Sequence, residues 1–109
     1  MASTALTIAL IKALGGGSGT HESAVSGSTP EITGADGTRY ICGEVSTLSI
    51  TVPETGMISV VFESGTTPTV LTIVGTVQWQ DGFDPTSLDA NTIYELNIAD
   101  GLGVVAQWA

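Results

Sequence analysis

The sequence predicts a mainly β protein: a small antiparallel β-sandwich or barrel that follows a short N-terminal helix and a Gly/Ser-rich arm. Only 12% of the 109 residues are charged, against about 25% in an average soluble protein, and Gly, Ser and Thr take their place. From Arg39 onward, short apolar stretches recur at intervals of about 10 residues, with turn sequences between them. We therefore expect three parts: an anchor helix over 1–14, a tether or extended arm over 15–38, and a β-sandwich over 39–109.

Residues 3–14, STALTIALIKAL, predict the N-terminal helix. Ser3 is a suitable N-cap, and Gly15 is a natural stop. The apolar residues cover almost the whole circumference, so this helix has to be buried. We expect it to act as an anchor that packs against other chains, and packing on its own domain is the alternative. The anchor residues are Leu6, Ile8, Leu10, Ile11 and Leu14.

Residues 15–38 are rich in Gly, Ser and Thr, which favours a flexible tether or an extended arm. Because such a tether transmits little packing energy, we expect the β-domain to stay folded when residues 1–15 are removed. His21 lies in this arm beside Glu22, and one histidine next to one acid does not make a metal site.

Strands are predicted where apolar and polar residues alternate. The stretch TVLTIV, residues 69–74, is nearly all apolar and is expected to be buried on both sides. The residues around Cys42 also predict a strand, in which a free cysteine is most often a small buried hydrophobe. The predicted core faces are Leu48, Ile50 and Val52; Ile58, Val60 and Phe62; and Tyr94, Leu96 and Ile98.

The two tryptophans, Trp79 and Trp108, are predicted to pack inside the fold. Trp108 shares its strand parity with Val104 and Ala106, so we expect this face of residues 102–108 to point inward. Trp79 precedes the turn sequence DGFDP and is expected near the edge of the sandwich. The alternative is a surface platform that binds a ligand through Trp79, Phe83 and Tyr94.

The charge of the chain excludes two classes of partner. The formal net charge is −9, and Lys12 and Arg39 are the only basic residues. Nucleic acids need clustered Lys and Arg, and anionic membrane surfaces attract the same residues, so neither is expected to bind. The apolar run near the N-terminus is too short to span a bilayer, which takes about 20 residues.

No catalytic set of residues is recognisable, so we expect neither an enzyme nor a bound cofactor or metal. The one His and the one Cys lie in differently structured regions, which disfavours a Cys–His pair. The sequence GGGSG lacks the GK[ST] ending of a phosphate-binding loop. Three acids share one loop, but their spacing matches no EF-hand; they are Asp81, Asp84 and Asp89.

The region from about Arg39 to the end, two thirds of the chain, resembles a small β-module of tailed-bacteriophage structural proteins. The motifs that carry the resemblance are F-x-S-G-x-T-P-T-x-L-T, then W-x-x-G-F or W-x-x-G-W, then Y-E-x-x-I-x-x-G and a terminal Trp. One departure is IVGTVQW, where the module has Pro near Gly75. The matching residues are Phe62, Ser64, Gly65, Thr67, Pro68, Thr69, Leu71, Thr72, Trp79, Gly82, Phe83, Tyr94, Glu95, Ile98, Gly101 and Trp108.

The resemblance implies a virion structural protein that forms a homotrimer. Such modules are similar to the C-terminal part of head-fibre, tail-fibre or baseplate proteins. A short helix, a tether and one β-domain without a long shaft favour a head fibre or capsid decoration protein. It would sit on the outer surface of the capsid, with its helix bound to the major capsid protein or another virion protein. The alternative is a tail-fibre or baseplate adhesin at the tail tip that binds host surface glycans.

Overall fold

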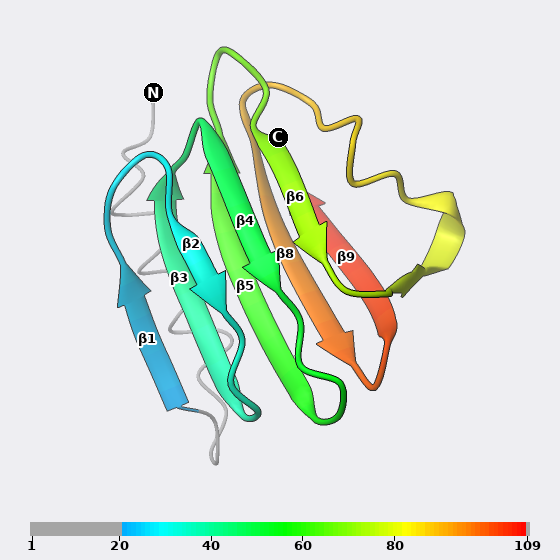
Figure 1. Cartoon of the computed structure of the whole chain (residues 1–109). Coiled ribbons are helices and arrows are strands. Elements are labelled where there is room, and N and C mark those ends of the chain that lie inside the picture. The colour runs from blue at the N-terminus through cyan, green and yellow to red at the C-terminus, as the bar shows by residue number, and fades with distance from the viewer. Residues whose placement is uncertain (1–20, 109) are drawn as a thin grey trace.

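A computed structural model describes residues 21–108, which form a β-sandwich of two unequal sheets (Figure 1). Residues 1–20 and 109 lie outside the described part, and so do the predicted N-terminal helix and its anchor residues. The strands are β1 (His21–Val25), β2 (Glu31–Thr33), β3 (Thr38–Glu44), β4 (Thr47–Thr51), β5 (Met57–Ser64), β6 (Val70–Val74), β7 (Gln78–Trp79), β8 (Thr92–Ala99) and β9 (Leu102–Trp108). The larger sheet has the order β1-β3-β5-β8-β9-β7, and the smaller sheet has the order β2-β4-β6.

From β1 to β6 the chain alternates between the two sheets, so that each strand of the larger sheet is followed by one of the smaller. One strand of the larger sheet and the following strand of the smaller sheet together make one coil of the chain. Successive coils lie side by side, and all neighbouring strands in this region pair in parallel. His21, Thr38 and Ile58, for example, follow one another across the larger sheet. Strands β1 to β6 are named the coiled part below.

Strands β8 and β9, the hairpin part, extend the larger sheet with antiparallel pairing. β8 runs antiparallel to β5 along its whole length, and β9 runs antiparallel to β8. Asp100 and Gly101 form the turn between them, with φ angles of 48° and 82°. Positive φ at both positions is the type I′ geometry, which matches the twist of the strands on either side.

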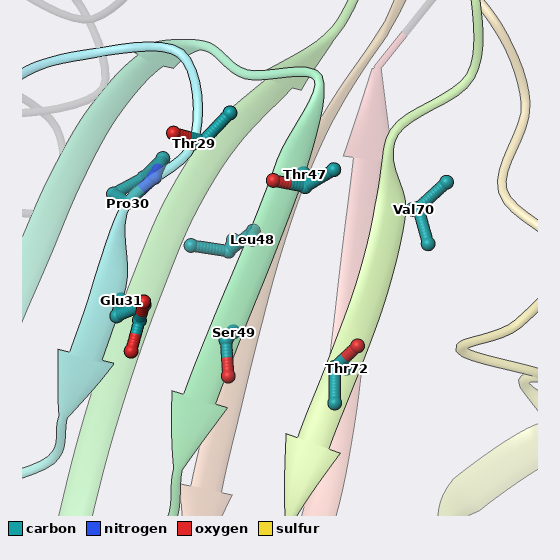
Figure 2. A pocket seen from close by; sticks show the side chains of 8 residues that line it. All are labelled: Thr29, Pro30, Glu31, Thr47, Leu48, Ser49, Val70 and Thr72. Carbon is teal, nitrogen blue, oxygen red and sulfur yellow. The ribbon is translucent and has the colours of Figure 1, made fainter.

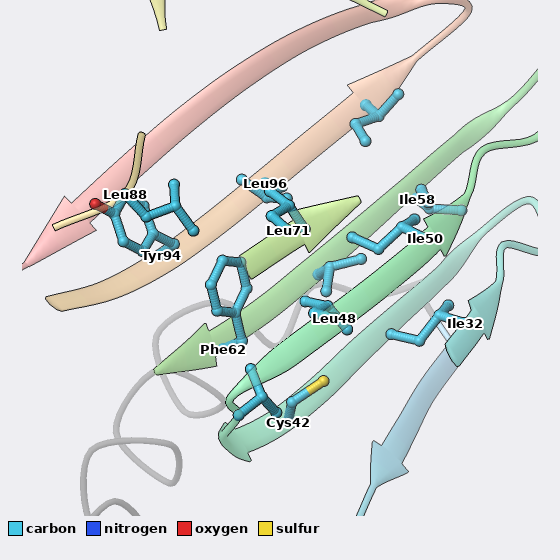
Figure 3. Packing of buried hydrophobic residues seen from close by; sticks show 13 residues of the cluster. Ile32, Cys42, Leu48, Ile50, Ile58, Phe62, Leu71, Leu88, Tyr94 and Leu96 are labelled. Atoms are coloured by element: carbon cyan, nitrogen blue, oxygen red, sulfur yellow. The ribbon is translucent and has the colours of Figure 1, made fainter. Parts of the chain in front are cut away.

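The hydrophobic core lies between the two sheets (Figure 3). The three predicted core faces on β4, β5 and β8 are confirmed: their residues belong to the core, except that Val52 is partly buried and packs against it. Cys42 is also buried there, as expected. The core residues are Ile32, Cys42, Val45, Leu48, Ile50, Ile58, Val60, Phe62, Leu71, Leu88, Tyr94, Leu96 and Ile98.

The mainly β class is therefore confirmed, but the predicted antiparallel arrangement is wrong for most of the molecule. Among the described strands, only β5 with β8 and β8 with β9 pair antiparallel. The physical reason is that each turn of the coiled part carries the chain across to the other sheet. The next strand in the same sheet then comes from the following coil and runs in the same direction.

Two strands come from the stretch expected to be a tether or extended arm. β1 and β2 lie within residues 15–38, and the expected boundary at Arg39 falls inside β3. Each strand adds an apolar side chain to the core region, Val25 from β1 and Ile32 from β2. Their backbones form hydrogen bonds with β3 and β4. A polar sequence can make such backbone hydrogen bonds as well as an apolar one.

The expectation that residues 69–74 are buried on both sides is wrong. In β6, Leu71 is buried, whereas Val70 and Val74 are 63% and 48% exposed. The reason is that the smaller sheet packs on the larger sheet through one face only, with the core between them, and nothing in the described structure covers its other face. One set of alternate residues along β6 therefore points to solvent.

Candidate functional site

The aromatic residues proposed as a binding platform are linked by a series of ring contacts. Trp79 and Phe83 meet edge to face, with ring centroids 5.2 Å apart and planes at 68°. Phe83 lies 6.3 Å from Tyr94, and Tyr94 stacks on Phe62 at 5.5 Å. The 3₁₀ turn η1 (Gln80–Gly82) follows β7 and brings Phe83 back onto Trp79.

This aromatic cluster is an extension of the core. Tyr94 is only 1% exposed, and its hydroxyl oxygen accepts a hydrogen bond from the backbone N–H of Asp89 at 2.7 Å. Trp79 and Phe83 are partly buried and pack against the core residues. Tyr94 therefore offers no ring face to a ligand, and the expected packing of Trp79 is confirmed.

The expected inward orientation of Trp108 is wrong. β8 and β9 pair so that Ile98 lies opposite Gly103 and Ile93 opposite Trp108. Because Ile98 faces the core, Gly103 faces it too, and Trp108 points to the outer side of the larger sheet. A Cβ on Gly103 would overlap Cε3 of Trp79, so the Trp79 ring occupies the space that a side chain would need. The close approach of Trp79 thus sets the orientation of the whole strand.

The outward side of β9 forms an exposed apolar strip. Leu102, Val104 and Trp108 are 49%, 46% and 44% exposed, and Ala106 between them is exposed as well. β7 pairs with β9 only at Leu102 and Gly103, so the backbone edge of residues 104–108 is open within the described structure. These four side chains, the β9 strip, combine apolar area with an open strand edge, which is typical of protein interaction surfaces.

A shallow pocket of about 480 Å³ lies on the outer side of the smaller sheet (Figure 2). Its polar groups come from three adjacent strands, since Glu31 of β2 pairs with Ser49 of β4 and Ser49 pairs with Thr72 of β6. Hydroxyls and a carboxylate at this spacing can donate hydrogen bonds to a polyhydroxylated ligand and accept them from it. The lining residues are Thr29, Pro30, Glu31, Thr47, Leu48, Ser49, Val70 and Thr72.

The titratable residues whose type would suit catalysis or metal binding are Cys42, Asp84 and His21, and they have structural places in this fold. Burial raises the pKa of the Cys42 thiol to about 12, which keeps it protonated and unreactive near neutral pH. The side chain and then the backbone N–H of Thr86 donate hydrogen bonds to Asp84, which lowers the pKa of that carboxyl. His21 begins β1 at the sheet edge.

Among residues 21–108, no group of three or more His, Cys, Asp or Glu side chains is placed to hold a metal ion. Asp81 belongs to η1, while Asp84 and Asp89 lie in the loop that follows. The Asp84 carboxylate accepts hydrogen bonds from Thr86 and closes a turn, and Asp89 donates its backbone N–H to the hydroxyl of Tyr94.

The described residues include no helix that is long and apolar enough to cross a membrane. The chain matches no family model, no curated protein and no solved structure.

Proposed function

We propose that this chain is a structural protein of a tailed-bacteriophage virion, most simply a head fibre or capsid decoration protein that displays a trimeric β-domain. Two things support the proposal. The sequence carries the ordered motifs that resemble the phage β-module. The β9 strip also provides an exposed apolar surface through which copies of the chain can associate. The strip is the observation that carries the assembly part of the proposal.

The geometry of the strip suits a small symmetric oligomer. Leu102, Val104, Ala106 and Trp108 stand in one row on the outermost long strand of the larger sheet. A domain of about 90 residues buries a limited core by itself, and oligomers gain stability by covering such apolar rows. In a trimer, the three rows would meet around the symmetry axis with the β9 edges close to it.

Solution mass tests the trimer. We expect the parent chain at micromolar concentration to have the mass of three copies, and Val104→Asp to have the mass of one, because a buried aspartate at the centre of the strip costs several kcal/mol. Val70→Asp is the matched control, since Val70 is also an exposed valine but lies on the other sheet, and it should remain trimeric. A parent chain that is a strict monomer would exclude the trimer.

Labelling of intact particles tests the location. Antibodies raised against the β-domain should decorate the heads of purified phage particles at many copies per head. Decoration restricted to the tail tip would favour the adhesin, and no decoration of any particle would exclude the virion role.

A host-glycan adhesin is the second candidate, and the pocket on the smaller sheet favours it. The carboxylate of Glu31 and the hydroxyls of Ser49 and Thr72 suit the hydroxyl groups of a sugar. On a glycan array, the parent chain should bind a defined set of glycans, and Ser49→Val should abolish that binding. Thr33→Val, on the same outer side but outside the pocket, should bind like the parent.

A further inference from the structure

The second half of strand β5, residues 60–64, is buried on both sides. Val60 and Val61 are consecutive residues, and both are 0% exposed. Consecutive side chains in a strand point to opposite faces of the sheet, and Val60 belongs to the core between the sheets. Val61 therefore points to the outer face of the larger sheet, where a residue of a two-layer sandwich is normally in contact with water.

Neighbouring outward residues are buried as well. Ile41 of β3, which pairs with Val61, is 7% exposed, and neither residue belongs to the core between the sheets. Arg39 of β3 forms an ion pair with Glu95 of β8 at 2.7 Å, so these side chains pass over β5 on the same face. They cannot be the outermost layer, because their own side chains are only 8% and 16% exposed.

The elements within residues 21–108 do not provide this cover. Every described strand belongs to one of the two sheets, and the smaller sheet lies on the opposite side of the core. The loop with η1 lies beside β6 and β9 in Figure 1, away from β3. The buried patch is also confined to the centre of the sheet, since Val104 and Trp108 on β9 are exposed. A cover of limited width, about that of one helix, fits this pattern.

The part of the chain outside the described residues has the right length, chemistry and attachment. It joins the described part at His21, the first residue of β1, which is the edge strand of this same sheet. Residues 3–14 would be about 18 Å long as a helix, and the distance from β1 to β8 is three strand spacings, or about 14 Å. The segment also has apolar residues on every side, which suits a position against Ile41 and Val61.

The outer face of the larger sheet and the N-terminal segment carry opposite charges. The outer face bears the acids Glu22, Glu63 and Glu95 by the alternation of β1, β5 and β8, together with Arg39. Lys12 is the only other basic residue of the chain, and it lies within the N-terminal segment. A cation placed over this acidic face would be favourable in a partly buried setting.

We propose that residues 1–20 pack on the outer face of the six-stranded sheet of their own chain, over β3 and β5, as a third layer of the fold. The proposal concerns the free protein and goes beyond the virion role. If the segment does bind a capsid protein, it has to leave this face, and capsid binding then competes with the third layer. Removal of residues 1–15 would therefore destabilise the β-domain, contrary to the expectation for a tether.

Cysteine labelling in the full-length chain tests the proposal. With Cys42 replaced by Ala, Val61→Cys places a thiol on the outer face and Val60→Cys places one in the core, and both are conservative in volume. Each is combined with Leu6→Asp and Leu10→Asp, which make the N-terminal segment unfit for an apolar surface. We expect both thiols to be protected from an aromatic disulfide reagent in the parent background. The two aspartates should speed labelling of Cys at position 61 at least ~10-fold and leave position 60 protected, because the opening is local.

Three results would overturn the proposal. Rapid labelling at position 61 in the parent background would mean that the outer face is open. Equal protection at position 61 with and without the aspartates would mean that something other than the N-terminal segment covers it. Loss of protection at position 61 on dilution to nanomolar concentration would mean that a second copy supplies the cover. If the aspartates expose both thiols by unfolding the chain, Leu10→Ala is compared instead, and the proposal again requires faster labelling at position 61 alone.

Discussion

The coiled part and the hairpin part build the same sheet by different pairing. In the coiled part, each strand lies next to a strand from the following coil, and a strand of the other sheet separates them along the chain. In the hairpin part, β8 and β9 are joined by two residues and pair directly. β4 and β5 of the coiled part and β8 of the hairpin part show the same alternation of apolar and polar residues. Alternation therefore identifies strands and faces but carries little information about which strands pair.

β5 links the two parts, because it is parallel to β3 on one side and antiparallel to β8 on the other. Substitutions on β5 should therefore affect the whole molecule, whereas substitutions in one part should report on that part.

Phe62→Ala should give the largest loss of stability. Phe62 is 0% exposed on β5 and stacks on Tyr94 of β8, so its removal leaves a cavity where the two parts meet. We expect the free energy of unfolding, measured by urea denaturation, to fall by about 3–5 kcal/mol. Val70→Ala, on the exposed side of β6, is the control and should change it by less than about 1 kcal/mol. A small effect of Phe62→Ala would mean that β5 does not join the parts into one unit.

The two tryptophans, Trp79 on β7 and Trp108 on the neighbouring strand β9, should differ sharply in their effect on stability. Trp79→Ala removes a ring that packs against the core and Phe83, and we expect a cost of about 2–4 kcal/mol in thermal or urea unfolding. Trp108→Ala should cost less than about 1 kcal/mol in the isolated domain, because the ring is 44% exposed. Trp108→Ala should instead weaken self-association. Equal costs at the two sites would contradict the observed orientation of β9.

Thr69→Val should destabilise the coiled part by about 1–2 kcal/mol, because buried hydrogen bonds are costly to lose. Thr69 lies between β5 and β6, where its hydroxyl donates to the backbone oxygen of Val45 at 2.6 Å. The backbone N–H of Thr69 donates a hydrogen bond to Oγ of Ser64 at 3.0 Å. Thr47→Val, at an exposed position on β4, is the control and should be near neutral in urea unfolding. If Thr69→Val left the free energy of unfolding unchanged, the hydrogen bond from Thr69 to Val45 would not stabilise the coiled part.

Cys42 should make stability depend on pH only in alkaline solution. Burial raises the pKa of its thiol from 9.0 to about 12, so the protonated thiol is favoured in the folded state. The stabilisation is complete below pH 9 and is lost between pH 9 and about 12, as the unfolded thiol ionises first. Urea midpoints of the parent should fall over this range more steeply than those of Cys42→Ala. Parallel curves for the two proteins would contradict the burial of the thiol.

The fold could be predicted from sequence where one face of a strand is clearly apolar. β4, β5 and β8 have this pattern, and their inward faces are as expected. β9 does not, because Val104 and Val105 are adjacent and give both faces an apolar residue. The deciding contact is the approach of Trp79 to Gly103, which brings together residues far apart in the chain and leaves no local signal.

β1 and β2 escaped prediction for a different reason. Their sequences are polar and rich in small residues, and their place in the sheets depends on backbone pairing with β3 and β4. Such pairing depends on the neighbour that is available, and the apolar pattern of the strand itself does not show it. In the aromatic cluster, the burial of Tyr94 and the packing of Trp79 could be predicted from the alternation of their strands. The contact of Phe83 with Trp79 could not, since it follows from the turn at η1.

The mixed neighbours of β5 also imply an order of folding. Closing the two-residue turn between β8 and β9 costs little chain entropy, and hairpins form in about 1–10 μs. Each parallel pair in the coiled part first has to close a long connection through the other sheet, which is slower. We therefore expect β8 and β9 to form early and to offer an edge to β5, after which β3 and then β1 add one coil at a time. Synthesis runs in the opposite direction, because the coiled part leaves the ribosome before β8. During that interval, β5 has an open apolar edge, and a nascent chain is most exposed to wrong pairing with its neighbours.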